Sequence, residues 1–140
     1  MINIKIKEIA EGFTPVYKHE MDACCDCKAN VDKVVIPRKK TMIIPLGFAV
    51  EIPNGWEGII KGRSGLSSKG IVCQIGCIDS NYRGEVGVIL TNLSENDFVI
   101  NRGDRVCQFK VQEAVKINFE KVKELTDTDR GESGFGSSGI

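Results

Sequence analysis

The chain has 140 residues, a length that fits one domain with a hydrophobic core, and 41% of its residues are hydrophobic. Nineteen basic residues balance nineteen acidic ones, so the formal net charge is zero and no global field is available to hold a nucleic-acid backbone or an anionic membrane. Composition therefore excludes recognition by overall charge, and any anion site must be local.

The N-terminal residues 1–7 (MINIKIK) alternate apolar and polar side chains. Strict alternation is typical of a β-strand, and these residues lack the continuous apolar stretch of an export signal. No later segment of the sequence is long and apolar enough to span a bilayer. We therefore expect a cytoplasmic protein, or one in the host-cell cytoplasm if a virus encodes it, with neither a membrane nor a nucleic acid as partner.

Six cysteines occur, three of them in the run at residues 22–27 (DACCDC). In a chain without an export signal, reduced thiols are expected rather than disulfides. Zinc binding is an alternative, but the spacing in this run is not the usual two-residue gap. We expect Cys73, Cys77 and Cys107 to fill core positions in strands as small apolar groups.

Further period-two runs indicate strands around residues 48–52 and 86–90. Residues that interrupt regular secondary structure divide the chain into short segments. They are Pro15, Pro37, Pro45, residues 53–55 (PNG), 83–84 (RG) and 101–104 (NRGD). This spacing is typical of a sandwich, a barrel or a jelly roll. One short helix is predicted, beginning at Ser64 as the capping residue, running to Lys69 and stopped by Gly70.

Residues 130–139 (RGESGFGSSG) have a single large apolar side chain, Phe135, and cannot build a core. A disordered terminus is one interpretation. The other is a lid over phosphates, in which glycine N–H groups, the hydroxyls of Ser137 and Ser138 and the charge of Arg130 contact an anion while Phe135 stacks on a base. We expect a loose tail from about Thr126 onward.

Five stretches resemble the motifs of the trimeric dUTPase family, in the family's order and with about its spacing. Each stretch alone is a weak signal, but five in sequence are specific, and the third and fifth are the most specific. They are residues 22–27 (DACCDC), 62–67 (GRSGLS), 76–85 (GCIDSNYRGE), 103–108 (GDRVCQ) and the tail.

The resemblance implies a dUTP diphosphatase, which cleaves dUTP to dUMP and pyrophosphate and so limits uracil incorporation into DNA and supplies dUMP for thymidylate synthesis. Residues from about Cys73 to Gly87 resemble the family's β-hairpin, whose main chain reads the edge of uracil. Tyr82 then lies under the deoxyribose, although an ordinary, partly buried aromatic is the alternative. By this resemblance the base and sugar contacts are Gln74, Gly76, Cys77, Ile78, Tyr82 and Gly87.

Asp79 follows the strand-like run at residues 71–78, so rigid backbone would hold its carboxylate at a pocket wall. In the family this aspartate activates the water that attacks the α-phosphorus, with pyrophosphate leaving in line. The alternative is a turn aspartate that bonds its own backbone before the turn at residues 81–84. With the motif around it, catalysis is the favoured interpretation.

The triphosphate needs positive charge and N–H donors. Arg63, Ser64 and Gly65 offer them at the start of the predicted helix, and the family implies phosphate contacts there. Gln108 is expected on a strand face opposite Cys107, Phe109 and Val111. In the family it contacts the phosphates or the attacking water, and plain surface exposure is the alternative.

Mg²⁺ is implied by the substrate, because this ion keeps several waters and binds chiefly to phosphate oxygens. Asp26 resembles the family aspartate that touches the metal through water. Cys24, Cys25 and Cys27 depart from the family's usual residues there, and Gly62 replaces a usual serine or proline.

The resemblance also implies the architecture, an all-β distorted jelly roll (β-clip barrel) with one short helix, assembled as a homotrimer. A dUTPase-like domain at residues 1–125 would carry a flexible arm at residues 126–140 that closes over a neighbouring active site. Edges left by period-two strands are compatible with such assembly. The substrate and product, dUTP and dUMP, and the other two subunits are then the partners.

Two rival functions remain. The related dCTP deaminases share the core but need a glutamate and an Arg-Arg or Ser-Arg arrangement that polarises the amine of cytosine, and no equivalent stands beside residues 73–79. A nucleotide sensor that regulates a protein partner would keep the same pocket, but nothing in the sequence indicates that partner. The sequence does not distinguish a cellular from a phage origin.

Overall fold

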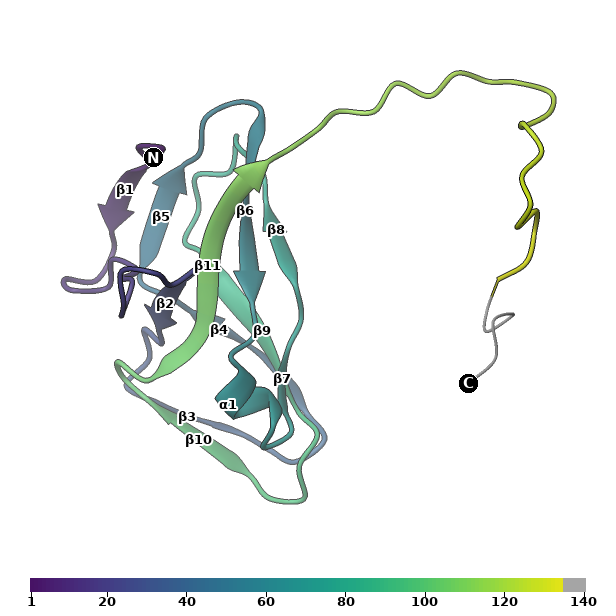
Figure 1. Cartoon of the computed structure of the whole chain (residues 1–140). Helices are drawn as coiled ribbons and strands as arrows, with labels where there is room; N and C mark the ends of the chain where they lie inside the picture. Colours follow the sequence, from purple (N-terminus) through teal and green to yellow (C-terminus); the bar gives the residue numbers. More distant parts are fainter. Residues whose placement is uncertain (135–140) are drawn as a thin grey trace.

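A computed structural model describes residues 1–134 of the chain (Figure 1). Within these residues it contains eleven β-strands and one short helix. The expectation of a mostly-β fold with one short helix is therefore confirmed. The elements are β1 (Lys5–Glu8), β2 (Cys25–Lys28), β3 (Lys33–Ile36), β4 (Thr41–Pro45), β5 (Phe48–Glu51), β6 (Trp56–Lys61), α1 (Ser64–Ser67), β7 (Ile71–Cys73), β8 (Gly76–Ile78), β9 (Gly87–Asn92), β10 (Phe98–Asn101) and β11 (Arg105–Glu113).

The strands pair antiparallel in four small sheets around one core. Their orders are β2-β11-β6-β8, β4-β9-β7, β1-β5 and β3-β10. Alternate residues of the strands point into the core, as in β9, where Val88, Leu90 and Asn92 are buried. Non-consecutive neighbours in every sheet mean that strands distant in sequence are brought side by side.

The longest strand, β11, organises the four-stranded sheet because it pairs with β2 on one side and β6 on the other. A register shift between Arg105 and Cys107 precedes the regular pairing. Cys107 and Phe109 are then buried while Gln108 lies on the other face, directly opposite Asp26 of β2. The predicted facing of this strand is confirmed.

The predicted helix is present, but two of its details were wrong. Arg63, with an extended backbone, is the N-cap residue and makes no side-chain capping bond, so Ser64 is the first helical residue instead of the cap. The helix ends at Ser67, with Ser68 as its C-cap. Gly70 has φ +81°, a conformation that glycine adopts without strain, and it ends the turn as expected.

Two predicted strands differ in extent. The run at residues 71–78 is divided into β7, which pairs with β9, and β8, which pairs with β6. The segment from Cys73 to Gly87 is thus a connection between two sheets and not a regular ladder of its own. At the N-terminus, β1 begins at Lys5, because β5 offers partners only from Phe48 to Glu51.

All six cysteines are free. Cys107 is buried opposite Cys27, and Cys73 packs at the margin of the core. Cys77 is exposed, so its prediction as a core residue was wrong: its side chain leaves β8 on the outer face, where Glu57 of β6 accepts a hydrogen bond from it.

Regular structure ends at Glu113, and the following residues run away from the body of strands (Figure 1). Residues 115–133 are all exposed. Among the described residues, no helix has the length and apolar character needed to cross a membrane.

Candidate active site

A cavity of about 290 Å³ lies where β2, β11 and the start of α1 meet. Three cationic side chains line it, those of Lys18, Arg63 and Arg105, together with the amide of Gln108. The carboxylates of Asp22 and Asp26 also line it, so three cations face two anions there. The remaining excess of positive charge and the amide donor favour an anion at this place, in a chain without net charge.

The carboxylate of Asp26 bonds to the side chains that line this cavity. Asp26 is only 8% exposed. Its Oδ2 accepts a hydrogen bond from Arg105 Nη1 at 2.9 Å, and its Oδ1 accepts one from Gln108 Nε2 at 3.2 Å. Arg63 Nε lies 3.4 Å from the same Oδ1, and Arg63 Nη1 donates to the carbonyl of Arg105 at 2.7 Å. The guanidinium of Arg63 is thereby held in place before any ligand arrives.

A second cavity, of about 240 Å³, lies along the connection from β8 to β9. Asp79 lines it directly after β8, and the other lining residues are Cys77, Ile78, Tyr82, Glu85, Val86 and Gly87. The main-chain carbonyl of Asp79 accepts a bond from Tyr82 N at 3.0 Å, which closes a turn. Among the described residues no hydrogen bond is found for the Asp79 carboxylate, so the alternative of a carboxylate that bonds its own turn is not what the structure has.

Side chains of the turn after Asp79 set the shape of the connection from β8 to β9. Tyr82 is 46% exposed, and its hydroxyl donates to the carbonyl of Glu85 at 3.0 Å. A Cβ at Gly84 would overlap the hydroxyl end of the Tyr82 ring, so Tyr82 could keep this position only beside a glycine. Arg83 Nη1 donates to the carbonyls of Ser80 and Tyr82. Tyr82 therefore lies folded against its own turn, with one face open to the cavity.

Cys77 precedes this turn and bonds outward. Its Sγ donates to Glu57 Oε2 at 2.6 Å, and Gln112 Nε2 donates to the other oxygen of the same carboxylate. The bond to Glu57, followed by burial and charge repulsion, raises the pKa of the Cys77 thiol to about 11. The thiol is therefore protonated at neutral pH and tethers β8 to β6.

The predicted site residues fall into two groups in a single chain. Arg63 and Gln108 line the cationic cavity, with Ser64 and Gly65 exposed beside Arg63 on α1. Asp79, Cys77, Ile78, Tyr82 and Gly87 line the second cavity. The two cavities share no lining residue. Gln74 and Gly76 flank the start of β8, and Gln74 N donates to the carbonyl of Ile89.

The predicted tail contacts stand apart from both cavities. Arg130 is exposed and bonds only locally among the described residues, from Nε to the carbonyl of Ser133 at 2.9 Å. Phe135, Gly136, Ser137 and Ser138 lie outside the described residues.

Sequence reasoning missed five lining residues of the cationic cavity: Lys18, Asp22, Ala23, Cys24 and Arg105. Arg105 stands inside the recognised GDRVCQ stretch, so its charge was a usable signal. The sequence around Lys18 gave no such signal, because the segment of Lys18 reaches β2 through a bridge between Val16 and Asp26.

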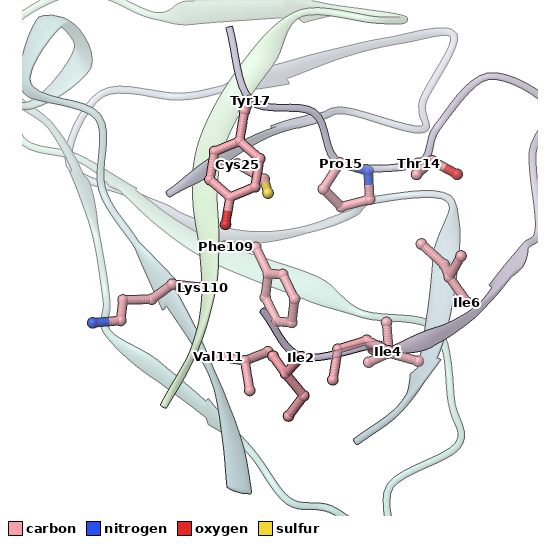
Figure 2. Close-up of a pocket in the computed structure, with 11 residues that line it drawn as sticks. Ile2, Ile4, Ile6, Thr14, Pro15, Tyr17, Cys25, Phe109, Lys110 and Val111 are labelled. Carbon is pink, nitrogen blue, oxygen red and sulfur yellow. The ribbon is translucent and has the colours of Figure 1, made fainter. Parts of the chain in front are cut away.

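A third hollow, an apolar groove of about 260 Å³, lies between the N-terminal segment and β11. Figure 2 shows Ile2 and Ile4 gathered beside Phe109 and Val111, with Tyr17 and Cys25 at the other end. It contains none of the predicted site residues.

Comparisons with known proteins agree on one family. A family model described as dUTPase matches residues 11–139. A deoxyuridine 5'-triphosphate nucleotidohydrolase of Anaplasma marginale is 40% identical over 146 residues, covering 99% of each chain. The dUTPase of Staphylococcus bacteriophage 80alpha, solved with dUPNHPP, has a TM-score of 0.91 at 26% identity and 100% coverage of both chains. The dUTPase of phage phi11 of S. aureus, described with a structural Mg(II) ion, has a TM-score of 0.80 at 24% identity, covers 88% of this chain and 98% of its own, and shows likeness of fold alone.

Replacing Asp26 by alanine should destabilise the chain, because Arg63 and Arg105 would then face each other without the carboxylate between them. We expect the free energy of unfolding in urea to fall by about 1–3 kcal/mol. Glu95→Ala is the control, since its pair with Lys39 is exposed and should contribute less than about 0.5 kcal/mol. Equal, small effects of the two substitutions would contradict the role given to Asp26.

Proposed function

The chain belongs to the dUTPase family and is a dUTP diphosphatase, and from that premise we propose that it converts dUTP to dUMP and pyrophosphate by in-line attack of an Asp79-activated water on the α-phosphorus. The reaction limits uracil incorporation into DNA and supplies dUMP for thymidylate synthesis.

The observation that carries the mechanism is the Asp79 carboxylate. It lines a cavity at the end of β8, is exposed, and has no hydrogen-bond partner within residues 1–134. A general base needs this combination of fixed backbone and free oxygens. The Asp79 carboxylate accepts a proton from the water as the oxygen of that water bonds to the α-phosphorus. The bond from the α-phosphorus to the bridging oxygen breaks, and pyrophosphate leaves.

For the base, we propose recognition by the main chain of Gly76, Cys77, Ile78 and Gly87, with Gln74 beside them and Tyr82 under the deoxyribose. Cys77, Ile78, Tyr82 and Gly87 line one cavity together with Asp79. A polar edge left unpaired in such a cavity costs about 1–3 kcal/mol. Several such contacts discriminate strongly against cytosine, and we propose that thymine is excluded because the cavity leaves no room for its methyl group.

For the triphosphate, we propose contacts from Arg63, Ser64, Gly65 and Gln108. The bonds to Asp26 and Arg105 support this, since they fix the Arg63 guanidinium and the Gln108 amide beside a cavity. Gly65 adds a separate argument. A Cβ there would meet no atom within 4 Å, so the space beside the Gly65 backbone is open, and glycine would let a phosphate approach its N–H closely.

For Mg²⁺, the donor set fits an ion held mainly by substrate and water. Within residues 1–134 no cluster of three or more metal-binding side chains is present. The Asp26 carboxylate accepts bonds from Arg105 and Gln108 but keeps lone-pair capacity for one water, so we propose that it contacts the ion through water. The bound ion would neutralise phosphate charge.

We propose a jelly-roll subunit that assembles as a homotrimer, with residues 1–125 as its domain and residues 126–140 as an arm. Arg130, Phe135, Gly136, Ser137 and Ser138 would close over a neighbouring site. Two apolar features support assembly: the groove of Figure 2, and exposed side chains at Val115, Ile117, Phe119, Val122 and Leu125, which are 57% to 86% exposed. Separate base and phosphate cavities are compatible with a site completed between subunits.

Incubating the purified chain with dUTP, dCTP or dTTP and Mg²⁺ tests the substrate. We expect pyrophosphate release from dUTP and little from the other two, because the edge of cytosine does not pair with the main chain of the base cavity and the methyl group of thymine does not fit in it. Ammonia release from dCTP would replace the proposal with a deaminase. Binding of dUTP without turnover would replace it with a nucleotide sensor.

Asp79→Asn should keep affinity for a nonhydrolysable dUTP analogue but lower kcat by about 10²–10⁴-fold, the usual contribution of a general base. Calorimetry would measure the first quantity and pyrophosphate release the second. Ser80→Ala, next to it, is the control and should stay close to wild type. An Asp79→Asn enzyme with near-normal kcat would remove the general-base assignment.

Deleting the residues after Thr128 should abolish most turnover and leave the assembly intact, because the arm is proposed to cover the site without forming the interface. Light scattering coupled to size exclusion would give the mass of the assembly. Full activity of the truncated chain would contradict the lid, and a monomeric full-length chain would contradict the trimer.

A further inference from the structure

Glu85 stands at the end of the turn that carries Asp79 and Tyr82, and it is not among the residues that the proposed function uses. Its Oε1 accepts two hydrogen bonds from outside the turn. Gly47 N donates to it at 2.9 Å, and Asn30 Nδ2 donates to it at 3.2 Å. One carboxylate oxygen thus joins the turn to two other parts of the fold.

The partner at Gly47 is a rigid point. Gly47 is buried, has φ +76°, and a Cβ there would meet the Phe13 ring at 2.8 Å. Its carbonyl accepts bonds from Ile9 N and Ala10 N. Because no other residue type fits this position and both of its polar groups are bonded, the Gly47 N–H has a fixed direction.

The other side-chain hydrogen bonds of the turn do less than those of Glu85 to fix the position of the turn in the fold. Arg83 and the Tyr82 hydroxyl bond to carbonyls of the turn itself, so they set its shape but not its position. Val86 exchanges main-chain bonds with Leu46 and Phe48, which fixes the last residue before β9. Glu85 extends this attachment to the residues that line the cavity with Asp79.

We propose that Glu85 is a positioning residue for base specificity: by holding Gly47 N–H and Asn30, its side chain fixes the cavity wall that reads uracil. The inference rests on the proposed function, since the cavity of Cys77, Asp79, Tyr82 and Gly87 must be the base site. This role requires an acceptor oxygen at position 85 and does not require a negative charge.

Glu85→Ala removes the acceptor and leaves a buried N–H unpaired, so the wall can shift or admit water. We expect KM for dUTP to rise about tenfold and the preference for dUTP over dCTP in kcat/KM to fall about tenfold, with kcat changed much less. Glu85→Gln is the matched variant. Its amide oxygen has two lone pairs and can accept both bonds, so its kinetics should stay within about twofold of wild type.

Thermal unfolding would establish that each variant is folded. Should Glu85→Ala not fold, Asn30→Ala removes one of the two bonds and should raise KM in the same direction by a smaller factor. Unchanged KM and base preference in Glu85→Ala or Asn30→Ala, or equal damage in Glu85→Gln, would overturn the positioning role. Failure of the wild-type chain to release pyrophosphate from dUTP in the same series would overturn the proposed function instead.

Discussion

The contact on which the cationic cavity depends is the ion pair and hydrogen-bond cluster at the buried carboxylate of Asp26. Strand β11 lies between β2 and β6, so the carboxylate of β2, the amide of β11 and the arginine after β6 meet on one face. A carboxylate that is 8% exposed is costly unless it is bonded. That cost enforces the geometry of Arg63 and Gln108. Of the three unusual cysteines, Cys27 is buried opposite Cys107 and Cys25 is half-buried in β2, whereas Cys24 lines the cavity.

A single chain holds the residues proposed for the phosphates and for the base in two separate cavities, one near α1 and one between β8 and β9. Rigid attachments define each of them: bonds to Asp26 in one, and bonds from Gly47 and Asn30 to Glu85 in the other. Assembly of several chains, as proposed above, would bring a base cavity of one subunit to a phosphate cavity of another.

Local patterns in the sequence predicted the strands, the short helix and the facing of Gln108 correctly, since alternation and glycine positions act over a few residues. The local patterns failed where the structure of a segment depends on residues far from it in the sequence. The division of residues 71–78 between two sheets depends on β6 and β9, and the exposure of Cys77 depends on Glu57. The same holds for the site. Motifs pointed to Arg63 and Asp79, but the bonds to Arg105 and Glu85 arise from contacts over 38 residues or more.

The central claim is that Asp79 activates the water that attacks the α-phosphorus. A crystal structure of the assembled protein with a nonhydrolysable dUTP analogue and Mg²⁺ tests it most directly. The account predicts a water within hydrogen-bond reach of the Asp79 carboxylate, about 2.6–3.2 Å, and in line with the bond from the α-phosphorus to the leaving oxygen. A uracil bound elsewhere, or a carboxylate turned away from the innermost phosphorus, would contradict it.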